Sequence, residues 1–309
     1  MTDKNIDSIK KKIGTPYEIT WCPGCPNFLL LEAVKRAISR IISEGNKQED
    51  FVMATGIGCH QKIFDYLNLS GVYGLHGRVL PVLVGIKLAN PNLIALGFAG
   101  DGDAYAEGME HLVHSARYNL DATYLIANNQ NFALTTGQAT PTSQEGYKTK
   151  VNPYGEFSKP INPIKIALAA GATFVARVNP KDIDGTADVI YKAIKHRGFS
   201  MVESVQDCVA FNLERNNLSQ IMYKIPDNKD TRKSDRFSVS DGSTKVYHDP
   251  SDIKKAYEIA DEWNYNGKKD KIAVGVIYQK ETSESMEEKW PQLKKLREKK
   301  VGWKGVKNS

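Results

Sequence analysis

Four consecutive residues in the middle of the chain, Gly100-Asp101-Gly102-Asp103, have the types and the setting of an anion- and metal-binding turn. They follow an apolar run over residues 93–99, and an amide pair, Asn128-Asn129, begins 28 residues after Gly100. Glycines let backbone amides approach an anion closely, and a helix N-terminus favours a diphosphate. A carboxylate and an amide oxygen suit Mg²⁺, which keeps phosphate oxygens in its shell. The pattern therefore indicates a metal–diphosphate site.

Two parallel strands would bring these residues together. The apolar runs over residues 93–99 and 122–127 predict buried strands. Between them, residues 104–120 carry apolar side chains at helical spacing, namely Met109, Leu112, Val113 and Ala116. A strand, a crossover helix and a second strand form a right-handed parallel unit. Asp101 and Asn129 should therefore emerge at the carboxyl edge of the sheet, where open α/β folds bind ligands.

The four cysteines form a second constellation. Cys22 and Cys25 make a C-x-x-C loop before an expected helix over residues 27–42. Cys59 and Cys208 each follow an expected strand, over residues 51–55 and 200–205, so both should lie at the same sheet edge as Asp101. Four thiolates can hold an iron–sulfur cluster or a structural zinc ion, whereas unrelated buried cysteines would need neither. Spacing alone does not separate these interpretations.

Length and composition exclude several classes of protein. With 309 residues, 41% hydrophobic and 25% charged, the chain is typical of a globular protein with a large core. It has no apolar run long enough to span a membrane, and residues 1–12 lack a signal core, so we expect a cytoplasmic protein without membrane contact. The net charge of +6 brings no recognised nucleic-acid motif with it. Residues 289–309 hold eight Lys or Arg and one Glu, which indicates a solvated tail or a docking surface for an acidic partner.

The spacing of Gly100-Asp101-Gly102 and Asn128-Asn129 resembles the signature of thiamine diphosphate enzymes. The alternatives are a tight glycine turn beside an Asn-rich loop, and a dinucleotide site. The latter fits poorly, because no G-x-G-x-x-G lies at a strand end and Asp101 would repel an unshielded pyrophosphate.

A wider set of motifs resembles the β subunits of 2-oxoacid:ferredoxin oxidoreductases, over residues 14–213 and again over residues 272–278. These motifs occur in one order along the chain: residues 21–25, 56–59, 76–78, 85–91, 100–103 and 136–138. The sequence departs from the family pattern after Cys25 and over residues 133–146, which puts the substrate in question more than the reaction class.

The resemblance implies three cofactors and the residues that bind them. Cys22, Cys25, Cys59 and Cys208 would hold one 4Fe–4S cluster, and Mg²⁺ would be bound by Asp101, the Asn129 side chain and the Asn131 backbone carbonyl. His76 is implied beside the cofactor or intermediate, and Lys62 is our hypothesis for the substrate carboxylate, although both could be structural. The residues expected to line the thiamine diphosphate are Ile57, Gly58, Cys59, His60, His76, Gly77, Arg78, Gly102, Asp103, Ala104, Tyr105, Ala133 and Leu134.

The resemblance also implies partners. Members of this family place the carboxylate that activates the aminopyrimidine on an α subunit or a γ–α fusion, so we expect a heterodimer or heterotetramer and assign no catalytic glutamate to this chain. The implied reaction is the oxidative decarboxylation of a 2-oxoacid, with coenzyme A as acyl acceptor and ferredoxin as electron acceptor. The basic tail, with Lys294, Lys295, Lys299 and Lys300, is a candidate docking site for ferredoxin.

The expected fold is a doubly wound, mostly parallel α/β sheet. We expect a cofactor- and cluster-binding domain over residues 1–210, and a C-terminal extension over residues 211–309. The extension would comprise a polar arm to residue 247, a helix over residues 252–263, a strand over residues 272–278 and the basic tail. Two other functions stay open. A non-redox thiamine diphosphate decarboxylase or lyase would not need four cysteines, and a zinc-binding scaffold would not need the Asp101-to-Asn129 spacing.

Overall fold

The computed structural model describes residues 3–212, 218–225, 248–262, 271–280 and 284–300. Its centre is an eight-stranded sheet with the order β2-β1-β3-β4-β6-β5-β8-β7. The strands are β1 (Phe51–Thr55), β2 (Ser70–Tyr73), β3 (Ile94–Gly100), β4 (Ala122–Asn128), β5 (Phe174–Val178), β6 (Phe199–Val205), β7 (Met222–Lys224) and β8 (Ile272–Gln279).

The first six strands run parallel, and β8 and β7 run against them. β3 and β4 are direct neighbours with Gly100 opposite Ala127, so their carboxyl ends meet at one edge. This confirms the expected parallel unit and the mostly parallel sheet. Strands β3, β4, β5 and β6 are apolar along most of their length because both faces are covered by helices.

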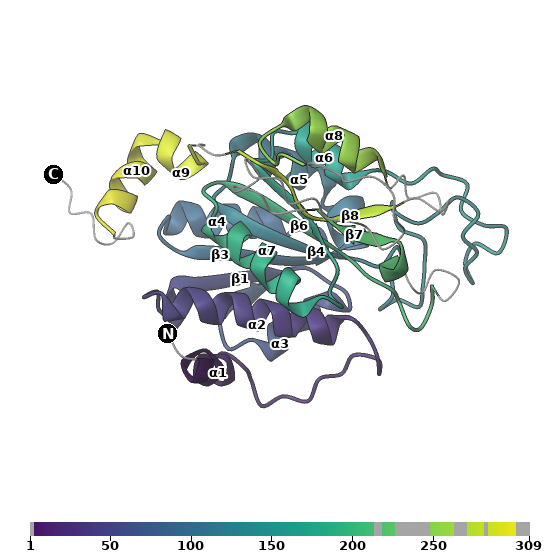
Figure 1. Ribbon diagram of the computed structural model, residues 1–309, viewed down its shortest axis with the longest axis horizontal. Coiled ribbons are helices and arrows are strands. Elements are labelled where there is room, and N and C mark those ends of the chain that lie inside the picture. The colour runs from purple at the N-terminus through teal and green to yellow at the C-terminus, as the bar shows by residue number, and fades with distance from the viewer. Residues whose placement is uncertain (1–2, 213–217, 226–247, 263–270, 281–283, 301–309) are drawn as a thin grey trace.

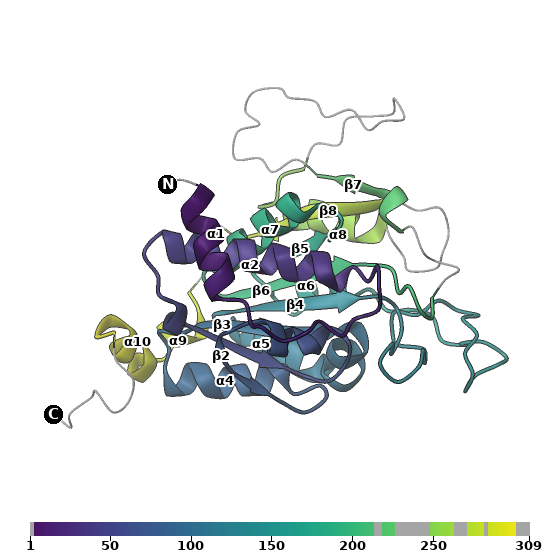
Figure 2. The ribbon, with the colours of Figure 1, turned by 90° about the horizontal axis from the view of Figure 1, so that it is seen from below.

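Helices cover both faces of the sheet (Figures 1 and 2). The larger helices of one face are α2 (Asn27–Ser43) and α7 (Ile183–Lys195), which pack against each other, and the short α3 (Ile63–Tyr66) lies on the same face. α1 (Asp3–Lys12) lies outside α2. The other face carries α4 (Val79–Ala89), α5 (Met109–Tyr118), α6 (Pro163–Ala169) and α8 (Ile253–Glu262).

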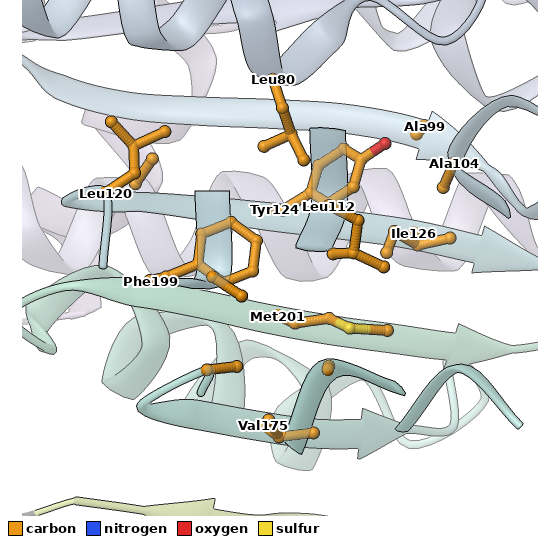
Figure 3. Packing of buried hydrophobic residues seen from close by; sticks show 14 of the residues in the cluster. Leu80, Ala99, Ala104, Leu112, Leu120, Tyr124, Ile126, Val175, Phe199 and Met201 are labelled. Atoms are coloured by element: carbon orange, nitrogen blue, oxygen red, sulfur yellow. The ribbon is translucent and has the colours of Figure 1, made fainter. Parts of the chain in front are cut away.

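Two hydrophobic layers hold this arrangement together, one on each face. Figure 3 shows part of the layer under α4 and α5, where Leu80 and Leu112 lie over Tyr124 and Met201 of the sheet. Each of these side chains is at most 2% exposed. Burying side chains of this size contributes roughly 1.5–3 kcal/mol apiece. The core therefore fixes the strands whose carboxyl ends carry the expected site residues.

The helix expected over residues 104–120 is interrupted. Residues 103–107 form a π-helical turn, Gly108 breaks the helix, and α5 begins only at Met109. A Cβ atom on Gly108 would lie 2.8 Å from the Asp103 carbonyl oxygen, so the close crossing of the backbone requires glycine. Single π turns inside helices occur frequently at functional sites.

The C-terminal part of the chain joins the same sheet through β7 and β8. Much of the expected polar arm, residues 213–217 and 226–247, lies outside the described residues, as do residues 301–309 of the basic tail. The division at residue 210 stays a prediction. Where the structure describes the chain, no helix combines the length and the apolar character needed to cross a bilayer.

The short helices α9 (Met286–Lys289) and α10 (Pro291–Glu298) carry the described part of the basic tail. Arg297 of α10 pairs with Asp121, which immediately precedes β4. The tail therefore packs at the amino edge of the sheet, away from the strand arrowheads in Figure 2.

Candidate functional site

A pocket with an empty volume of about 480 Å³, partly open to solvent, lies at the carboxyl ends of β1, β3 and β4. Polar groups from three loops converge on it. Open α/β sheets bind their ligands at this edge, outside the carboxyl ends of the strands. The sequence-predicted residues that line it are Ile57, Gly58, Cys59, His60, His76, Asp101, Gly102, Asp103, Asn129, Asn131, Ala133 and Leu134.

Asp101, at the end of β3, is buried and 1% exposed. Its Oδ2 accepts hydrogen bonds from Thr140 Oγ1 at 2.6 Å and Thr142 Oγ1 at 2.8 Å. Burial raises the pKa of Asp101 to about 6, although these hydroxyls and backbone N–H groups oppose the rise. Within the described chain, no Lys, Arg or His forms an ion pair with this carboxylate. A buried carboxylate without a counter-ion is costly, and an added cation would offset that cost.

The two residues of the Asn128-Asn129 pair have different surroundings. Asn128 is fully buried and its Nδ2 donates to Glu203 Oε1 at 2.9 Å, beneath the pocket. Asn129 lines the pocket, and its Oδ1 accepts from the Asn131 backbone N–H at 3.2 Å. Asn131 is 3% exposed and its Oδ1 has no hydrogen-bond partner. Asn129 and Asn131 thus offer amide oxygens in the same pocket as Asp101, and such oxygens suit a cation that prefers oxygen ligands.

Asp103, at the start of the π turn, holds the neighbouring loops in place. Its Oδ1 accepts from the Gly77 backbone N–H at 2.5 Å and its Oδ2 accepts from Gln61 Nε2 at 2.9 Å. Burial raises the pKa of Asp103, while these donors and His76 oppose the rise. His76 Nε2 lies 3.8 Å from both Asp103 Oδ1 and Glu107 Oε2. Asp103 therefore brings His76 to the rim of the pocket.

His60 and Gln61 face the pocket with buried polar atoms that have no partner. Both ring nitrogens of His60 and the Oε1 of Gln61 are unpaired, and the side chains are at most 3% exposed. Burial lowers the pKa of His60 to about 3, so the ring is neutral at physiological pH. Such atoms cost free energy unless a ligand or water pairs with them. They support the interpretation of the pocket as a binding site.

Besides Cys22, Cys25 and Cys208, five of the expected site residues do not line the pocket. Gly77 and Arg78 lie behind it, where Arg78 Nη1 donates to the Glu107 carbonyl at 2.8 Å. Ala104 belongs to the hydrophobic core, and the Tyr105 hydroxyl donates to Glu203 at 3.1 Å. Lys62 lies on the cysteine side, with its ammonium 3.1 Å from Thr20 Oγ1. A role for Lys62 at the substrate carboxylate stays a prediction.

The four cysteines come from three segments that specific hydrogen bonds tie together. The indole N–H of Trp21, beside the C-x-x-C loop, donates to the Cys59 carbonyl at 2.5 Å. Gln206, just before Cys208, donates through Nε2 to Asn27 Oδ1 at 2.9 Å, at the start of α2. None of the four thiols forms a disulfide.

The thiols influence one another electrostatically, which indicates that they share one neighbourhood. Burial raises the pKa of Cys25 to about 11, the Asn27 backbone N–H opposes this, and the other three thiols add to the rise. Burial also raises the pKa of Cys59, and the ammonium of Lys62 opposes it. Within the described residues, no three His, Cys, Asp or Glu side chains lie close enough to hold a single metal ion. The two candidate groups use four thiolates differently: a zinc ion binds all of them itself at about 2.3 Å, whereas a cluster binds each thiolate to a different iron.

Several residues of the site carry no local sequence signal. Gln61, Phe132 and Thr135 line the pocket between predicted residues, and Thr140 and Thr142 reach Asp101 from about forty residues away. The motif that includes Thr140 was visible only as a departure from the family pattern. The buried Arg177–Glu203 pair beneath the site gave no signal, because it lies within two strands that appear purely structural in sequence.

Comparison with family models finds two matches along the chain. Residues 56–204 match the thiamine pyrophosphate enzyme, C-terminal TPP binding domain. Residues 238–295 match the model for the C-terminal part of the beta chain of pyruvate ferredoxin oxidoreductase. The first match contains the whole of the pocket except Asn27 and Gln206.

Curated relatives and a solved structure agree with these matches. A 2-oxoacid:ferredoxin oxidoreductase subunit beta of Saccharolobus solfataricus is 38% identical over 87% of this chain and 84% of its own length. A 2-oxoglutarate synthase subunit KorB of Archaeoglobus fulgidus is 43% identical over 61% of this chain and 69% of its own. The structure of 2-oxoglutarate:ferredoxin oxidoreductase from Magnetococcus marinus, with 2-oxoglutarate, coenzyme A and succinyl-CoA bound, superimposes with a TM-score of 0.79 at 29% identity, covering 96% of this chain and 92% of that one. The chain belongs to the family of 2-oxoacid:ferredoxin oxidoreductase β subunits.

Proposed function

We propose that this β subunit binds thiamine diphosphate through Mg²⁺ at the carboxyl edge of its sheet, and that Asp101, the Asn129 side chain and the Asn131 backbone carbonyl supply the protein ligands. The observation that carries the proposal is Asp101, a buried carboxylate without an ion-pair partner in the described part of the chain, beside the unpaired Oδ1 of Asn131. The donors are all oxygen atoms, which suits Mg²⁺. The Phe132 ring packs directly on Gly102, since a Cβ there would lie 2.1 Å from the ring.

The residues of the pocket have different roles in binding the cofactor. Asp101 supplies negative charge to the cation, and the cation neutralises the diphosphate. Asp103 fixes the loop of Gly77 and the side chain of Gln61, which keeps His76 at the rim. His60, neutral and unpaired, offers a hydrogen bond to a ligand rather than a charge. When bound, thiamine diphosphate supplies the electron sink for decarboxylation of a 2-oxoacid, and the protein supplies position and electrostatics.

We propose further that Cys22, Cys25, Cys59 and Cys208 bind one 4Fe–4S cluster. Four cysteines outside any disulfide, from three hydrogen-bonded segments, support this, because such clusters are held by four thiolates. Cys59 belongs both to this group and to the pocket lining, so the two sites are contiguous. That contiguity favours ferredoxin as the electron acceptor and gives no support to a non-redox decarboxylase or lyase.

The remaining partners follow from the family. We propose that the chain acts with an α subunit, or a γ–α fusion, in a heterodimer or heterotetramer, and uses coenzyme A as acyl acceptor. The relatives include 2-oxoacid and 2-oxoglutarate enzymes, which supports a 2-oxoacid as substrate. The basic tail is a weaker candidate for ferredoxin docking than its charge alone indicated. Its described part, up to Lys300, packs at the amino edge of the sheet, opposite the cysteines.

Cofactor analysis of the complex tests the proposal. The chain should be co-expressed with its α subunit, purified without oxygen, and analysed for thiamine diphosphate, magnesium and iron. We expect one thiamine diphosphate, one Mg²⁺ and about four irons per β chain. Zinc in place of iron would contradict the cluster, and a complex that cannot be loaded with thiamine diphosphate would contradict the pocket assignment.

A further inference from the structure

Two buried hydroxyl groups hold the Asp101 carboxylate in one orientation. Thr140 and Thr142, which are 6% and 0% exposed, both donate to Asp101 Oδ2, at 2.6 and 2.8 Å. Hydrogen bonds to a charged acceptor are stronger than those between neutral groups. Because both hydroxyls meet the same oxygen atom, the carboxylate cannot rotate without breaking both hydrogen bonds.

Thr142 also touches the second half of the site. Its Oγ1 lies 3.1 Å from Asn128 Oδ1. A hydroxyl has one hydrogen, and the nearer, charged oxygen of Asp101 is the better acceptor for it. Asn128 Oδ1 instead receives the Gln130 backbone N–H at 3.2 Å. Thr142 therefore contacts one side chain at the end of β3 and one at the end of β4.

Asn128 is oriented from below by a fully buried ion pair. Its Nδ2 donates to Glu203 Oε1, while Arg177 Nε donates to Glu203 Oε2 at 3.0 Å. Glu203 and Arg177 are both 0% exposed. Since Nδ2 is fixed on Glu203, Oδ1 must face the Gln130 N–H. That bond stabilises Gln130 at φ 58°, a left-handed conformation that is unfavourable for a residue with a side chain. The turn so formed presents Asn129 and Asn131 to the pocket.

We infer that Thr142 and Asn128 are positioning residues for the metal site, and that the Arg177–Glu203 pair anchors them. The inference rests on the proposed Mg²⁺ site: Thr142 orients the acidic ligand, and Asn128 orients the turn that carries the amide ligands. A buried ion pair is weak evidence for stability, and its best-attested use is to specify one arrangement among several. Residues that support metal ligands in this way contribute about 10–100-fold to metal affinity.

The test measures metal binding and not activity. The purified complex, with its α subunit, is stripped of metal, saturated with thiamine diphosphate and titrated with Mn²⁺, and free Mn²⁺ is read by electron paramagnetic resonance. Thr142→Val removes the hydroxyl, so we expect the Kd for Mn²⁺ to rise about 10–100-fold. Thr142→Ser keeps the hydroxyl and should restore most of the affinity. Asn128→Ala should weaken Mn²⁺ binding by a similar factor.

Thr173→Val is the matched control. Thr173 is also buried, and its Oγ1 donates to Asn119 Oδ1 at 2.7 Å, but at the amino edge of the sheet. Its loss should leave the Kd for Mn²⁺ unchanged. If Thr142→Val and Asn128→Ala bind Mn²⁺ like the wild type while Asp101→Ala does not, the positioning role is wrong and the metal site stands. If Asp101→Ala itself binds Mn²⁺ like the wild type, the proposed metal site is wrong, and the inference fails with it.

Discussion

The two edges of the parallel sheet each hold a carboxylate, buried at the carboxyl edge and partly buried at the amino edge, but only the amino edge supplies it with cations. At the amino edge, Asp121 lies 3.4 Å from Lys87 Nζ and 2.9 Å from Arg297 Nη2. Burial would raise the pKa of Asp121, yet these two cations outweigh it and lower the pKa. At the carboxyl edge, burial raises the pKa of Asp101, and only neutral donors oppose it.

The difference separates a structural cluster from a binding site. Lys87, which is 1% exposed, also donates to the carbonyls of Pro91 and Leu93, so its three donors are all used. The carboxyl edge instead contains unpaired atoms on His60, Gln61 and Asn131. A protein that folds with such atoms unpaired is less stable than it would otherwise be. The polar groups at the carboxyl edge are therefore arranged for a ligand, and those at the amino edge for the fold.

The largest effect should come from neutralising Asp101, the carboxylate that has no cationic partner among the described residues. Asp101→Asn keeps the shape but removes the negative charge, so the rate of 2-oxoacid oxidation by the complex should fall more than about 100-fold, beyond the loss typical of a supporting residue. The metal-free protein should lose no stability, because no ion pair is broken. Steady-state kinetics and thermal unfolding of the metal-free complex measure the two quantities. A marked fall in melting temperature would show that Asp101 has a structural role like that of Asp121.

The second largest effect should come from the loss of one thiol, which should impair electron transfer. Cys59→Ser should remove the cluster, with loss of bound iron and of the brown colour, because a serine hydroxyl is not a thiolate ligand. The amount of thiamine diphosphate bound should change much less, since Cys59 contributes only part of the pocket lining. Iron analysis beside thiamine diphosphate analysis checks this. Retention of all the iron would remove Cys59 from the cluster.

The reverse experiment at the amino edge should change stability and leave the chemistry intact. Lys87→Met leaves Asp121 with Arg297 alone and two carbonyls unpaired, so the free energy of unfolding should fall by roughly 3 kcal/mol. The Kd for Mn²⁺ should not change, because the two edges share no side chain. Denaturant unfolding and Mn²⁺ titration of the same sample measure both. Weaker Mn²⁺ binding in a folded variant would show that the edges are coupled.

The smallest effect should be on the pH dependence of stability, through His196. Burial lowers the pKa of His196, at the amino edge, to about 4, and its Nε2 lies 2.9 Å from Thr173 Oγ1. The unfolded chain, with a histidine pKa near 6.5, binds the proton more readily. Stability should therefore be full above about pH 6.5 and fall as pH drops toward 4, by about 1 kcal/mol between pH 7 and 5.5. His196→Gln should flatten this dependence in thermal unfolding; an unchanged slope would assign it to other groups.

The strands and long helices were predictable from sequence because their apolar patterns are continuous. Residues 51–55, 122–127 and 272–278 matched β1, β4 and β8 to within one residue at each end. The break at Gly108 was not predicted, because the apolar spacing from Met109 onward is compatible with an unbroken helix. Short β2 is exposed along its length, so it has no apolar signature. The antiparallel direction of β8 depends on its neighbour and not on its own residues.

The site was predictable where a motif carries it. The turn of Asp101 and the loop of Asn129 meet as expected, because adjacent parallel strands fix both ends. Thr142 and Glu203 were missed, because their roles arise from contacts between residues 41 and 75 positions apart. Sequence spacing within one element says nothing of such contacts. The resemblance covered the proposed cofactor ligands and gave no information about the residues that support them.

The π turn at residues 103–107 has a consequence for how this chain can vary. A regular helix turns about 100° per residue, and the wider turn accommodates an extra one before α5 begins. Deleting one residue from this turn would shorten it to a regular helical turn, which would displace the residues of the turn, among them Asp103, and leave Leu112 and Ala116 of α5 in the core. A change of length in this stretch would therefore act on the pocket first, because Asp103 would lose its bonds to Gly77 and Gln61, and on the core much less.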